Sequence, residues 1–423
     1  MRSRRGPWCS ASPSCATSGS SQRRDWCLRF GTVPSAERLP GNRAPKNPKT
    51  VAPSAPGGSA YRDEVLKWCA EAGLDAAGVA PAIPLERARA QIESRIEHDL
   101  VNGMKFTFWR PERSVRPDLL VEGARSIVVG ARSYAHSDPP VEIDGPVARL
   151  ARYAWIDHYG DLKRSLTEVA AQLRRDGHRA TVFADDNSVV DREVAHLAGL
   201  GWYGKNANIL VPTKGSMHVL GCLVTTADLP ALPVVEDGCG ACSRCIPACP
   251  TGAIVGPGVI DANRCLSWLL QKPGVFAPDH RVALGDRIYG CDDCQTACPV
   301  NKRETLREPP PGARAGIDVL ALLSADDRAL AEVSDTWWVH DRDMTWVRRN
   351  LLLVLGNTAD PADRRVASVL TAHLAHEKSV VRAHAVWAAA RLGLDELIEP
   401  LRSDTAPDVS AEFARLPALR HDL

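Results

Sequence analysis

The chain has 423 residues, of which 44% are hydrophobic and 24% charged, a composition typical of a globular protein with two or three domains. No apolar run approaches the roughly 20 residues of a membrane-spanning helix, so the sequence excludes an integral membrane protein. The net charge of +1 conceals an asymmetry, because residues 1–60 hold ten Lys/Arg and two Asp/Glu whereas the remainder holds 42 and 49. The mildly acidic body excludes nucleic-acid binding by overall charge and leaves only a local basic patch for it.

Eight of the thirteen cysteines fall between Cys239 and Cys298, and the other five are scattered. A disulfide framework spreads its cysteines through a small secreted domain, whereas a tight group in a long chain is typical of metal binding. Metal-binding thiols persist in a reducing compartment, so the sequence predicts a cytoplasmic protein.

Residues 1–60 are rich in Ser, Pro, Gly and Arg and show no sustained hydrophobic period. We expect this stretch to be disordered or to come from an over-extended translation start. An organellar transit peptide is an alternative that only the Arg- and Ser-rich, acid-poor composition favours.

Order is expected to begin at Tyr61, because residues 61–80 have the pattern of an amphipathic helix ended by Gly73 and followed by a short strand. Strand-like and helix-like runs then alternate, which predicts an α/β sandwich over residues 61–236. The runs are SIVVGARSY (126–134), LKRSLTEVAAQLRRDG (162–177), RATVFA (179–184) and HVLGCLVTT (218–226).

Residues 237–305 hold the grouped cysteines among many Gly, Pro and Asp, as expected where metal bonds replace a hydrophobic core. The last predicted domain, 306–423, begins with a Pro- and Gly-rich linker (307–316), and its remaining residues have a helical pattern. Two runs within them align with a period of 34 that places Arg348 on Arg382, which predicts a short helical-repeat domain with a binding face. The runs are WVRRNLLLVLGN (346–357) and VVRAHAVWAAARLG (380–393).

The first cysteine run, from Cys239 to Pro250, has the C-x2-C-x2-C-x3-C-P spacing of bacterial ferredoxins. A second run, from Cys291 to Pro299, supplies C-x2-C-x3-C-P, and Cys265 stands between the two. In two-cluster ferredoxins the fourth cysteine of a run binds the other cluster. This crossing predicts two 4Fe–4S clusters, the first on Cys239, Cys242, Cys245 and Cys298 and the second on Cys249, Cys265, Cys291 and Cys294.

A pair of zinc sites is the alternative, because C-x2-C pairs also bind zinc. Zinc does not require C-x3-C-P on both arms, so the pattern favours a bacterial ferredoxin-like domain over residues 237–305. Two clusters relay single electrons, and such a relay must end at a site where a reaction uses the electrons. We expect that site in the α/β domain.

With these cysteines and several further motifs, the sequence resembles the epoxyqueuosine reductase family over most of residues 61–395. The motifs are GMKFTFWRPERSVRPDLLVEGARSIV (103–128), ARYAWIDHYGDLKRSL (151–166), DDNSVVDREVAHLAGLGWYGKNANIL (185–210), KGSMHVLG (214–221), NRCLSWLLQKPG (263–274) and an Arg-Asn…Gly-Asn helix (349–357). Members of that family reduce the epoxide of a modified guanosine at the wobble position of tRNA, using cobalamin and two 4Fe–4S clusters.

The resemblance implies that the α/β domain binds cobalamin, base-off and with no protein ligand to cobalt, and that the helical repeats of residues 306–423 are HEAT-like. It places the family's proton-donating aspartate on Asp185, whose pKa the neighbouring carboxyl group of Asp186 and an apolar corrin would raise. It also implies cofactor contacts from Arg152, Asp185, Gly201, Lys205, Asn206 and Ser216.

Partners are implied as well. They are the tRNA anticodon stem-loop and an external low-potential electron donor, with no membrane, and the chain is expected to be a monomer. Tryptophans of the helical region are candidate stacking surfaces for unpaired bases, and its arginines are candidates for phosphate contacts. These residues are Trp337, Trp338, Trp346, Arg342, Arg348, Arg349 and Arg382.

Each of these assignments has a structural alternative. Residues 185–188, Asp-Asp-Asn-Ser, could form only a turn after a strand. The glycines of GLGWYGKN (199–206) could serve a tight turn instead of close approach to a flat ligand. The tryptophans of the helical region could be core, and its arginines could cap helices or pair with Asp341, Asp343 and Asp363.

The sequence therefore predicts an oxidoreductase that converts epoxyqueuosine in tRNA to queuosine, with Asp185 as the acid and the clusters as an electron relay. Departures from the family's motifs, such as Asp157-His158-Tyr159 in place of Asp-Tyr-His, keep a second prediction open. It is a cobalamin-dependent paralogue that acts on a small electrophile. A third possibility is a ferredoxin-type electron carrier without catalysis, which the additional α/β domain argues against.

Overall fold

The computed structural model describes residues 55–303 and 306–419. The leader predicted at residues 1–60 therefore lies almost entirely outside the described residues, and its disorder stays a prediction. The first helix, α2, spans Ser59–Glu71. The helix predicted from the sequence is thus confirmed with a slightly earlier start, and Gly73, at a φ of +85°, follows its end as expected.

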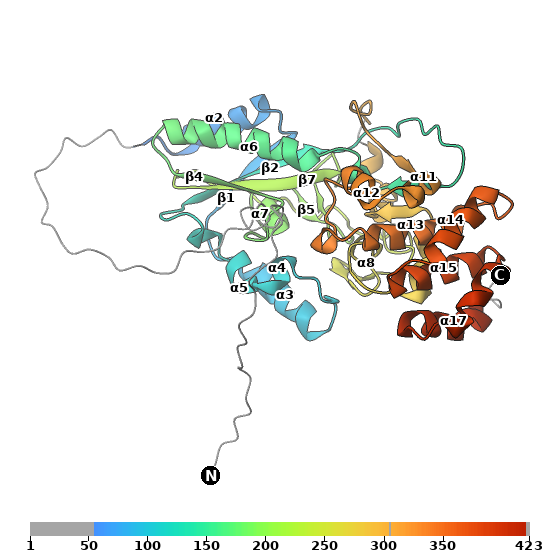
Figure 1. Ribbon diagram of the computed structural model, residues 1–423. Helices are drawn as coiled ribbons and strands as arrows, with labels where there is room; N and C mark the ends of the chain where they lie inside the picture. The colour runs from blue at the N-terminus through green and yellow to red at the C-terminus, as the bar shows by residue number, and fades with distance from the viewer. Residues whose placement is uncertain (1–54, 304–305, 420–423) are drawn as a thin grey trace, which may run out of the picture. The chain divides into compact units, whose positions relative to one another are not determined.

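Four antiparallel strands form the central sheet of the α/β part (Figure 1). They are β1 (Ala76–Pro81), β2 (Ser126–Ser133), β4 (Ala180–Ala184) and β7 (His218–Thr225), in the order β1-β2-β7-β4. The two central strands pair from Ser126 opposite Thr225 to Ser133 opposite His218. Nearly all their side chains are buried on both faces, which explains why these runs are continuously apolar.

Helices cover both faces of this sheet (Figure 1). They are α3 (Glu86–Glu97), α4 (Phe106–Trp109), α5 (Pro111–Ser114), α6 (His158–Arg175) and α7 (Asp191–Leu197), together with α2. Val65 of α2 and Leu166 of α6 belong to one apolar core, and Ile92 of α3 and Val194 of α7 to another on the opposite face. The predicted α/β arrangement of helices and strands is confirmed.

The sequence of α6 shows why one of these helices forms where it does. Asp157 caps its N-terminus by accepting a hydrogen bond from the Gly160 amide at 2.8 Å. Leu162, Leu166 and Leu173 repeat at helical spacing and are fully buried. The same spacing predicted the helix, and only its first turn was missed.

A smaller sheet joins the three predicted domains. Its middle strand, β3 (Val147–Leu150), pairs in parallel with β10 (Arg287–Tyr289) and antiparallel with β11 (Gly316–Asp318). One apolar core continues through all three segments and includes Leu266 and Leu351. A common core therefore crosses the domain boundaries predicted at residues 236 and 305. That each predicted domain has a separate function stays a prediction.

The cysteine-bearing region has little regular structure, as its composition predicts. Its elements are β8 (Ile254–Gly256), β9 (Val259–Ile260), α8 (Leu266–Leu269), α9 (Arg281–Leu284) and α10 (Asp293–Thr296). Because α10 lies between Cys291 and Cys298, contacts of this short helix determine where the second cysteine run is held.

The chain after residue 318 is helical, as predicted (Figure 1). The helices are α11 (Val319–Ser324), α12 (Asp327–Val333), α13 (Thr345–Thr358), α14 (Arg364–Leu374), α15 (Ser379–Arg391), α16 (Asp395–Ile398) and α17 (Pro407–Leu419). The first residues of α13 and α15, 345 and 379, are 34 apart, which confirms the period. Within the described residues, no helix has both the length and the apolar composition to cross a membrane.

Arg348 and Arg382 occupy equivalent positions in this repeat and make equivalent contacts. Arg348 donates to the carbonyl oxygen of Ala325, just after α11, and pairs with Asp327 at 2.8 Å. Arg382 donates to carbonyl oxygens just after α14 and pairs with Asp404 at 2.8 Å. Both arginines therefore satisfy the end of an earlier helix. The expectation that they contact tRNA phosphates is not supported, and the helix-capping alternative is confirmed for both.

The other residues predicted to contact tRNA differ in exposure. Arg349 is 1% exposed, whereas Arg342 lies at the surface and donates to backbone carbonyl oxygens. Trp337 is buried and stacks on a tyrosine, so it is a core residue, and Trp346 is partly buried. Trp338 keeps 41% of its surface exposed, and it is the member of the set that can still stack on a ligand.

Candidate active site

Asp185 lies directly after β4, at the carboxyl end of an edge strand of the central sheet. Its φ of +54° is unusual for a residue other than glycine, and backbone strain of this kind is concentrated at functional sites. The predicted turn is present, but Asp186 makes it by accepting a hydrogen bond from the Ser188 amide at 2.6 Å. In the part of the chain that the structure describes, no hydrogen bond or ion pair engages the Asp185 carboxyl group. The two aspartates therefore have separate roles.

The surroundings of Asp185 favour its protonated form. The side chain reaches solvent, but protein atoms surround it on most sides, and this desolvation raises its pKa above the usual value. The carboxylates of Asp191, Asp157 and Asp186 raise the pKa further, and Lys163 opposes them. The predicted rise is confirmed in direction, although burial and Asp191 contribute more than the expected neighbour, Asp186. A carboxyl group that keeps its proton to higher pH is suited to act as an acid.

Two tyrosines lie within electrostatic reach of this carboxyl group. Burial, followed by the charges of Asp191 and Asp185, raises the pKa of Tyr159 well above its usual value. Burial also raises the pKa of Tyr289 to about 12, with a contribution from Asp185. Both phenols therefore stay protonated and can donate hydrogen bonds at the site.

The order Asp157-His158-Tyr159 decides which side chain lies near the acid. Burial lowers the pKa of His158 to about 4, so its imidazole is neutral, and the ring stacks on His136 with centres 5.9 Å apart. Tyr159 is the member of the pair whose pKa responds to Asp185. The departure from the family's motif therefore affects the immediate surroundings of the candidate acid.

The eight cysteines predicted to bind iron form two groups. In the first, the pKa of Cys245 is raised by burial and then by the thiols of Cys239, Cys298 and Cys242. Cys298 belongs to the second run of the sequence, so the fold brings together the four cysteines that the crossed pattern assigned to one cluster.

In the second group, burial raises the pKa of Cys294 to about 12, with contributions from Cys265 and Cys249 and a smaller one from Cys245 of the first group. Cys291 lies beside Cys294. Among the described residues, no three His, Cys, Asp or Glu side chains converge closely enough to hold one metal ion. In a 4Fe–4S cluster each thiolate binds a different iron, and all eight cysteines are free thiols available for such bonds.

The residues predicted to contact the cofactor lie along the junction between the sheet and the cysteine region. Arg152 lies 3.5 Å from the carboxylate of Asp292, and Lys205 donates at 2.7 Å to a carbonyl oxygen within the first cysteine run. Asn206 is buried and donates to the carbonyl oxygen of Cys294 at 3.5 Å. The structure brings these residues together beside the thiols, and their contact with a cofactor stays a prediction.

Ser216, also predicted, belongs to a buried network that the sequence did not reveal. Gln295 of α10 donates to the Ser216 carbonyl oxygen at 2.7 Å and to the Tyr134 hydroxyl at 2.9 Å. The side chain of Asn301 accepts from the Ser216 amide at 2.6 Å and donates to the Ser216 hydroxyl at 3.1 Å. We call these four residues the amide network. No signal in the sequence distinguishes its buried amides from exposed ones.

Gly201 is explained by packing. It precedes a short hairpin of β5 (Trp202–Tyr203) and β6 (Ile209–Leu210). A Cβ atom at this position would lie 2.1 Å from the carbonyl oxygen of Leu210, so only glycine fits. This contact favours the tight-turn alternative at Gly201, and its role in binding a cofactor stays a prediction.

Two family models match this chain. Residues 238–301, which include all eight clustered cysteines, match the 4Fe-4S double cluster binding domain. With the two groups of thiols, this match defines the class: the chain is an iron–sulfur protein that binds two 4Fe–4S clusters. Residues 115–186, which include Asp185, match the model described as Epoxyqueuosine reductase QueG, DUF1730.

Two relatives extend the match to most of the chain. The epoxyqueuosine reductase of Xanthomonas campestris is 33% identical over 339 residues, which cover 77% of this chain and 94% of that protein. The enzyme of Bacillus anthracis is 29% identical over 357 residues, which cover 80% of this chain and 91% of that protein. The chain belongs to the epoxyqueuosine reductase family.

Solved structures of the family share the fold. An epoxyqueuosine reductase crystallised with an epoxyqueuosine-modified tRNA-Tyr stem loop gives a TM-score of 0.77 at 27% identity, over 85% of this chain and 98% of that one. The Bacillus subtilis enzyme, with its catalytic aspartate loop swung out of the active site, gives a TM-score of 0.76 at 27% identity. The match covers 85% of this chain and 99% of that one.

The raised pKa of Asp185 predicts a pH-dependent stability. Because the folded state favours the protonated acid, its contribution to the free energy of unfolding is present below about pH 4 and is lost as the pH rises through the raised pKa. Asp185→Asn, which is always neutral, should raise the midpoint of thermal unfolding near pH 7, with a gain that shrinks toward pH 4. The exposed control Asp335→Asn should show no such trend. A gain that does not depend on pH would contradict the assigned environment.

Substitution within the amide network should lower the midpoint of thermal unfolding, whereas Asp185→Asn should raise it. Gln295→Ala leaves the Ser216 carbonyl oxygen and the Tyr134 hydroxyl without this donor in the interior, which should cost about 1–3 kcal/mol and lower the unfolding midpoint of the cluster-loaded protein. Gln271→Ala removes one bond at a partly exposed site and is the matched control, with an expected cost below about 1 kcal/mol. Equal effects would show that the network does not hold the two parts together.

Proposed function

We propose that this protein is an oxidoreductase that reduces epoxyqueuosine to queuosine at the wobble position of tRNA. The observation that carries the proposal is Asp185, a carboxyl group with a raised pKa beside protonated phenols, in a chain that also groups eight cysteines. The family relative crystallised with a modified tRNA stem loop supports the choice of substrate.

The reaction has a simple balance that the site must satisfy. Both C–O bonds of the epoxide break, a C=C bond forms, two electrons and two protons are consumed, and water is released. The chain therefore has to supply an electron path, a proton at the departing oxygen and a surface for RNA.

The electron path is assigned to the two cysteine groups. Cys239, Cys242, Cys245 and Cys298 would hold the first cluster, and Cys249, Cys265, Cys291 and Cys294 the second. Burial raises the pKa of Cys291 and Cys294 in the second group more strongly than that of Cys245 in the first. We therefore place the entry of electrons from an external low-potential donor at the first cluster and their exit toward Asp185 at the second.

Cobalamin is the proposed cofactor between the clusters and the substrate. When bound, it supplies a cobalt centre that accepts electrons singly and passes them to an electrophilic carbon. Two buried polar atoms in this zone, His158 Nε2 and Asp292 Oδ1, have no hydrogen-bond partner among the described residues. An amide-rich cofactor would satisfy such atoms, so the residues fit. Arg152, Lys205, Asn206 and Ser216 are the further residues that we propose to contact it, with Gly201 nearby.

Asp185 has the role of proton donor. Its raised pKa keeps the proton available, and expulsion of the epoxide oxygen as an alkoxide would otherwise be unfavourable. Its left-handed backbone conformation presents the carboxyl group outward, since Asp186 forms the turn. Tyr159 and Tyr289 can donate hydrogen bonds that orient the substrate.

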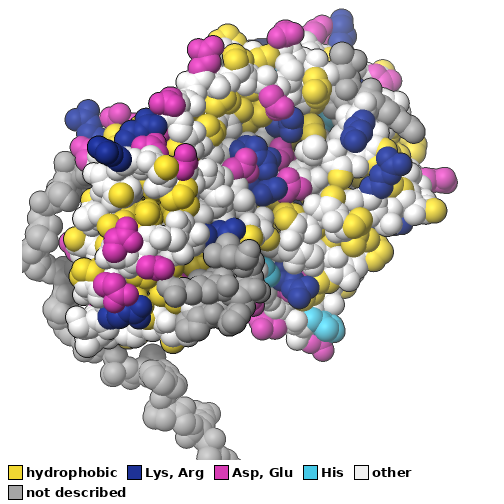
Figure 2. Space-filling model, turned by 90° about the vertical axis from the view of Figure 1, so that its right-hand side faces the viewer, with side chains coloured by type: hydrophobic (Ala, Val, Ile, Leu, Met, Phe, Trp, Pro, Cys, Tyr) yellow, Lys and Arg dark blue, Asp and Glu magenta, His cyan; other side chains and the backbone are white. Residues whose placement is uncertain are grey.

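The remaining assignments follow from this function. Residues 61–236 would form the cobalamin-binding catalytic domain, 237–305 the ferredoxin-like domain and 306–423 a HEAT-like domain that helps to bind the tRNA anticodon stem-loop. The face seen in Figure 2 carries basic and acidic side chains mingled together, without one large basic area. Binding of RNA would therefore depend on local contacts. We propose that the protein acts in the cytoplasm as a monomer.

A second candidate is a paralogue that reduces a different, small electrophile with the same cofactors. The exchanged order of His158 and Tyr159 favours it, because a phenol rather than an imidazole neighbours the acid. The helical region argues against it, because a small substrate needs no such docking surface.

Conversion of the modified nucleoside tests the proposal. After anaerobic loading with iron, sulfide and cobalamin, the native chain should convert epoxyqueuosine in tRNA to queuosine, as measured by mass analysis of the nucleosides. Asp185→Asn should lower the rate by about 10²- to 10⁴-fold without loss of iron. The native rate should fall as the pH rises through the raised pKa of Asp185, because the acid is then deprotonated.

Asp186→Asn is the control for this experiment, since asparagine can form the same turn. It should keep the conversion and move the pH profile to lower pH, because one of the carboxylates that raise the pKa of Asp185 is gone. An Asp185→Asn chain as fast as the native one would contradict the role of acid. No conversion by the native chain, with cobalamin bound, would favour the paralogue.

A further inference from the structure

Three aromatic rings, Phe106, Trp268 and Trp338, form what we call the aromatic ledge. The ring centres of Phe106 and Trp338 are 5.4 Å apart, and Trp268 lies 5.8 Å from the first and 6.0 Å from the second. Trp268 is buried, whereas Trp338 is 41% exposed. An exposed ring supported by two others keeps its flat face available at low cost in entropy, as surfaces that stack on bases do.

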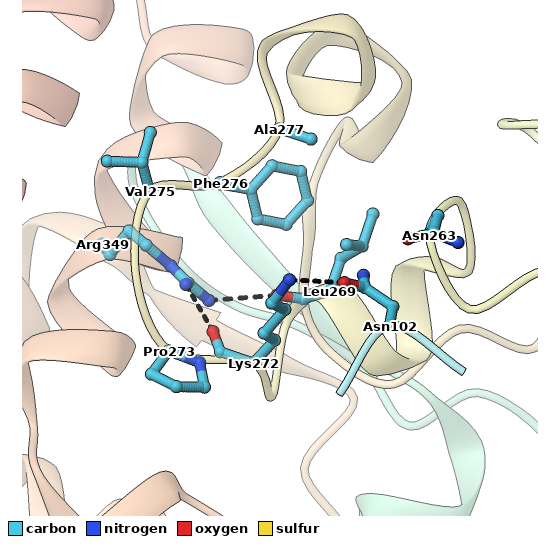
Figure 3. Close-up of a pocket in the computed structure, with 9 residues that line it drawn as sticks. All are labelled: Asn102, Asn263, Leu269, Lys272, Pro273, Val275, Phe276, Ala277 and Arg349. Atoms are coloured by element: carbon cyan, nitrogen blue, oxygen red, sulfur yellow. Dashed lines mark hydrogen bonds between the residues drawn. The ribbon is translucent and has the colours of Figure 1, made fainter. Parts of the chain in front are cut away.

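Figure 3 shows a positively charged pocket of about 200 Å³. It adjoins the ledge through Asn102, whose carbonyl oxygen accepts a hydrogen bond from Trp268. Lys272 and Arg349 contribute to its wall together with Asn102 and Asn263. Among the described residues, neither cation forms an ion pair: Lys272 donates to the side-chain oxygen of Asn102, and Arg349 donates to carbonyl oxygens and to its neighbouring asparagine. Two positive charges without a carboxylate partner favour an anion in this pocket.

The two cations differ in what they can offer. All three guanidinium nitrogens of Arg349 donate hydrogen bonds to protein acceptors. Arg349 can therefore attract an anion in the pocket by its charge, but it has no nitrogen left to bind one directly. The ammonium group of Lys272 has three donors, and within the described ranges it makes one hydrogen bond, to Asn102. Lys272 is therefore the group that can donate directly to a bound anion.

Hydrogen bonds connect the pocket to the ledge, and the ledge to Tyr289. Trp268 donates from its indole nitrogen to the Asn102 carbonyl oxygen at 3.1 Å, which joins the ledge to the pocket. The Trp338 amide donates to the Tyr289 hydroxyl at 2.7 Å, and Tyr289 is one of the two phenols near Asp185. A ligand unit stacked on Trp338 would thus lie beside Tyr289, one of the phenols that we propose to orient the substrate.

We infer that the ledge and the pocket together bind the nucleotide adjacent to the modified one in the tRNA loop, with its base on Trp338 and a phosphate at Lys272. The inference rests on the proposed function. A loop that turns one nucleotide out toward an active site loses the stacking of its neighbour, and an aromatic surface with an adjacent ammonium group replaces both the stacking and the charge pairing.

Binding of an unmodified stem-loop RNA, measured by fluorescence anisotropy over a range of salt concentrations, tests this inference separately from the chemistry. Trp338→Ala should weaken binding by roughly 5- to 100-fold, and Trp338→Phe, which keeps a flat ring, should restore most of it. Lys272→Gln should reduce the salt slope by about 0.7, the value for one phosphate of a single strand, and Lys272→Arg should restore the slope. Lys67→Gln, on the exposed surface of α2, is the control and should change neither quantity.

The outcomes separate the two proposals. If the native chain converts epoxyqueuosine while Trp338→Ala and Lys272→Gln bind RNA as the native chain does, the inference fails and the proposed function stands. If inorganic phosphate alone raises the unfolding midpoint of the native chain, and Lys272→Gln abolishes that rise without weakening RNA binding, the pocket serves a free anion and the inference is overturned. A native chain that neither binds the stem-loop nor converts it overturns both.

Discussion

The amide network is the interaction on which the arrangement of the candidate site depends. Gln295 and Asn301 flank Cys298, the last cysteine of the second run, and their bonds to Ser216 and Tyr134 hold that run against the ends of the two central strands. In a region with few regular elements, little else fixes the backbone before a metal cluster does. Buried amides tolerate only one arrangement, because each donor or acceptor left without a partner costs about 1–3 kcal/mol. The network thus determines where thiols meet the sheet that presents the acid.

The amide network stabilises the fold, whereas the surroundings of Asp185 destabilise it. Asp185 has a left-handed backbone, several carboxylates around it and no hydrogen bond to its side chain in the described structure, and each of these features disfavours the folded state near neutral pH. The same features keep its proton in place and its carboxyl group accessible, which is what a proton donor needs. A framework of buried hydrogen bonds around a strained and electrostatically unfavourable acid is the balance between stability and activity expected of an enzyme. The neighbouring phenols, Tyr159 and Tyr289, complete the site without adding charge.

Features that depend on spacing along the chain could be predicted from the sequence. The grouping of Cys298 with the first cysteine run follows from the C-x3-C-P pattern, and helices α6, α13 and α15 follow from periodicity. Features that depend on distant partners could not. Arg349 was expected at a surface, but it is buried and donates to four carbonyl oxygens some 75 to 80 residues earlier in the chain, besides its bonds to the adjacent Asn350. Likewise the main charged neighbour of Asp185 is Asp191, at the start of the next helix, and not the adjacent Asp186.

The crossed arrangement of the clusters beside the acid is the central claim, and anomalous diffraction at the iron edge from crystals of the reconstituted protein tests it most directly. The account predicts two separate iron sites. One should lie among Cys239, Cys242, Cys245 and Cys298, and the other among Cys249, Cys265, Cys291 and Cys294, with the second nearer to Asp185. A single iron site, or one cluster held by the four cysteines of the first run alone, would contradict it.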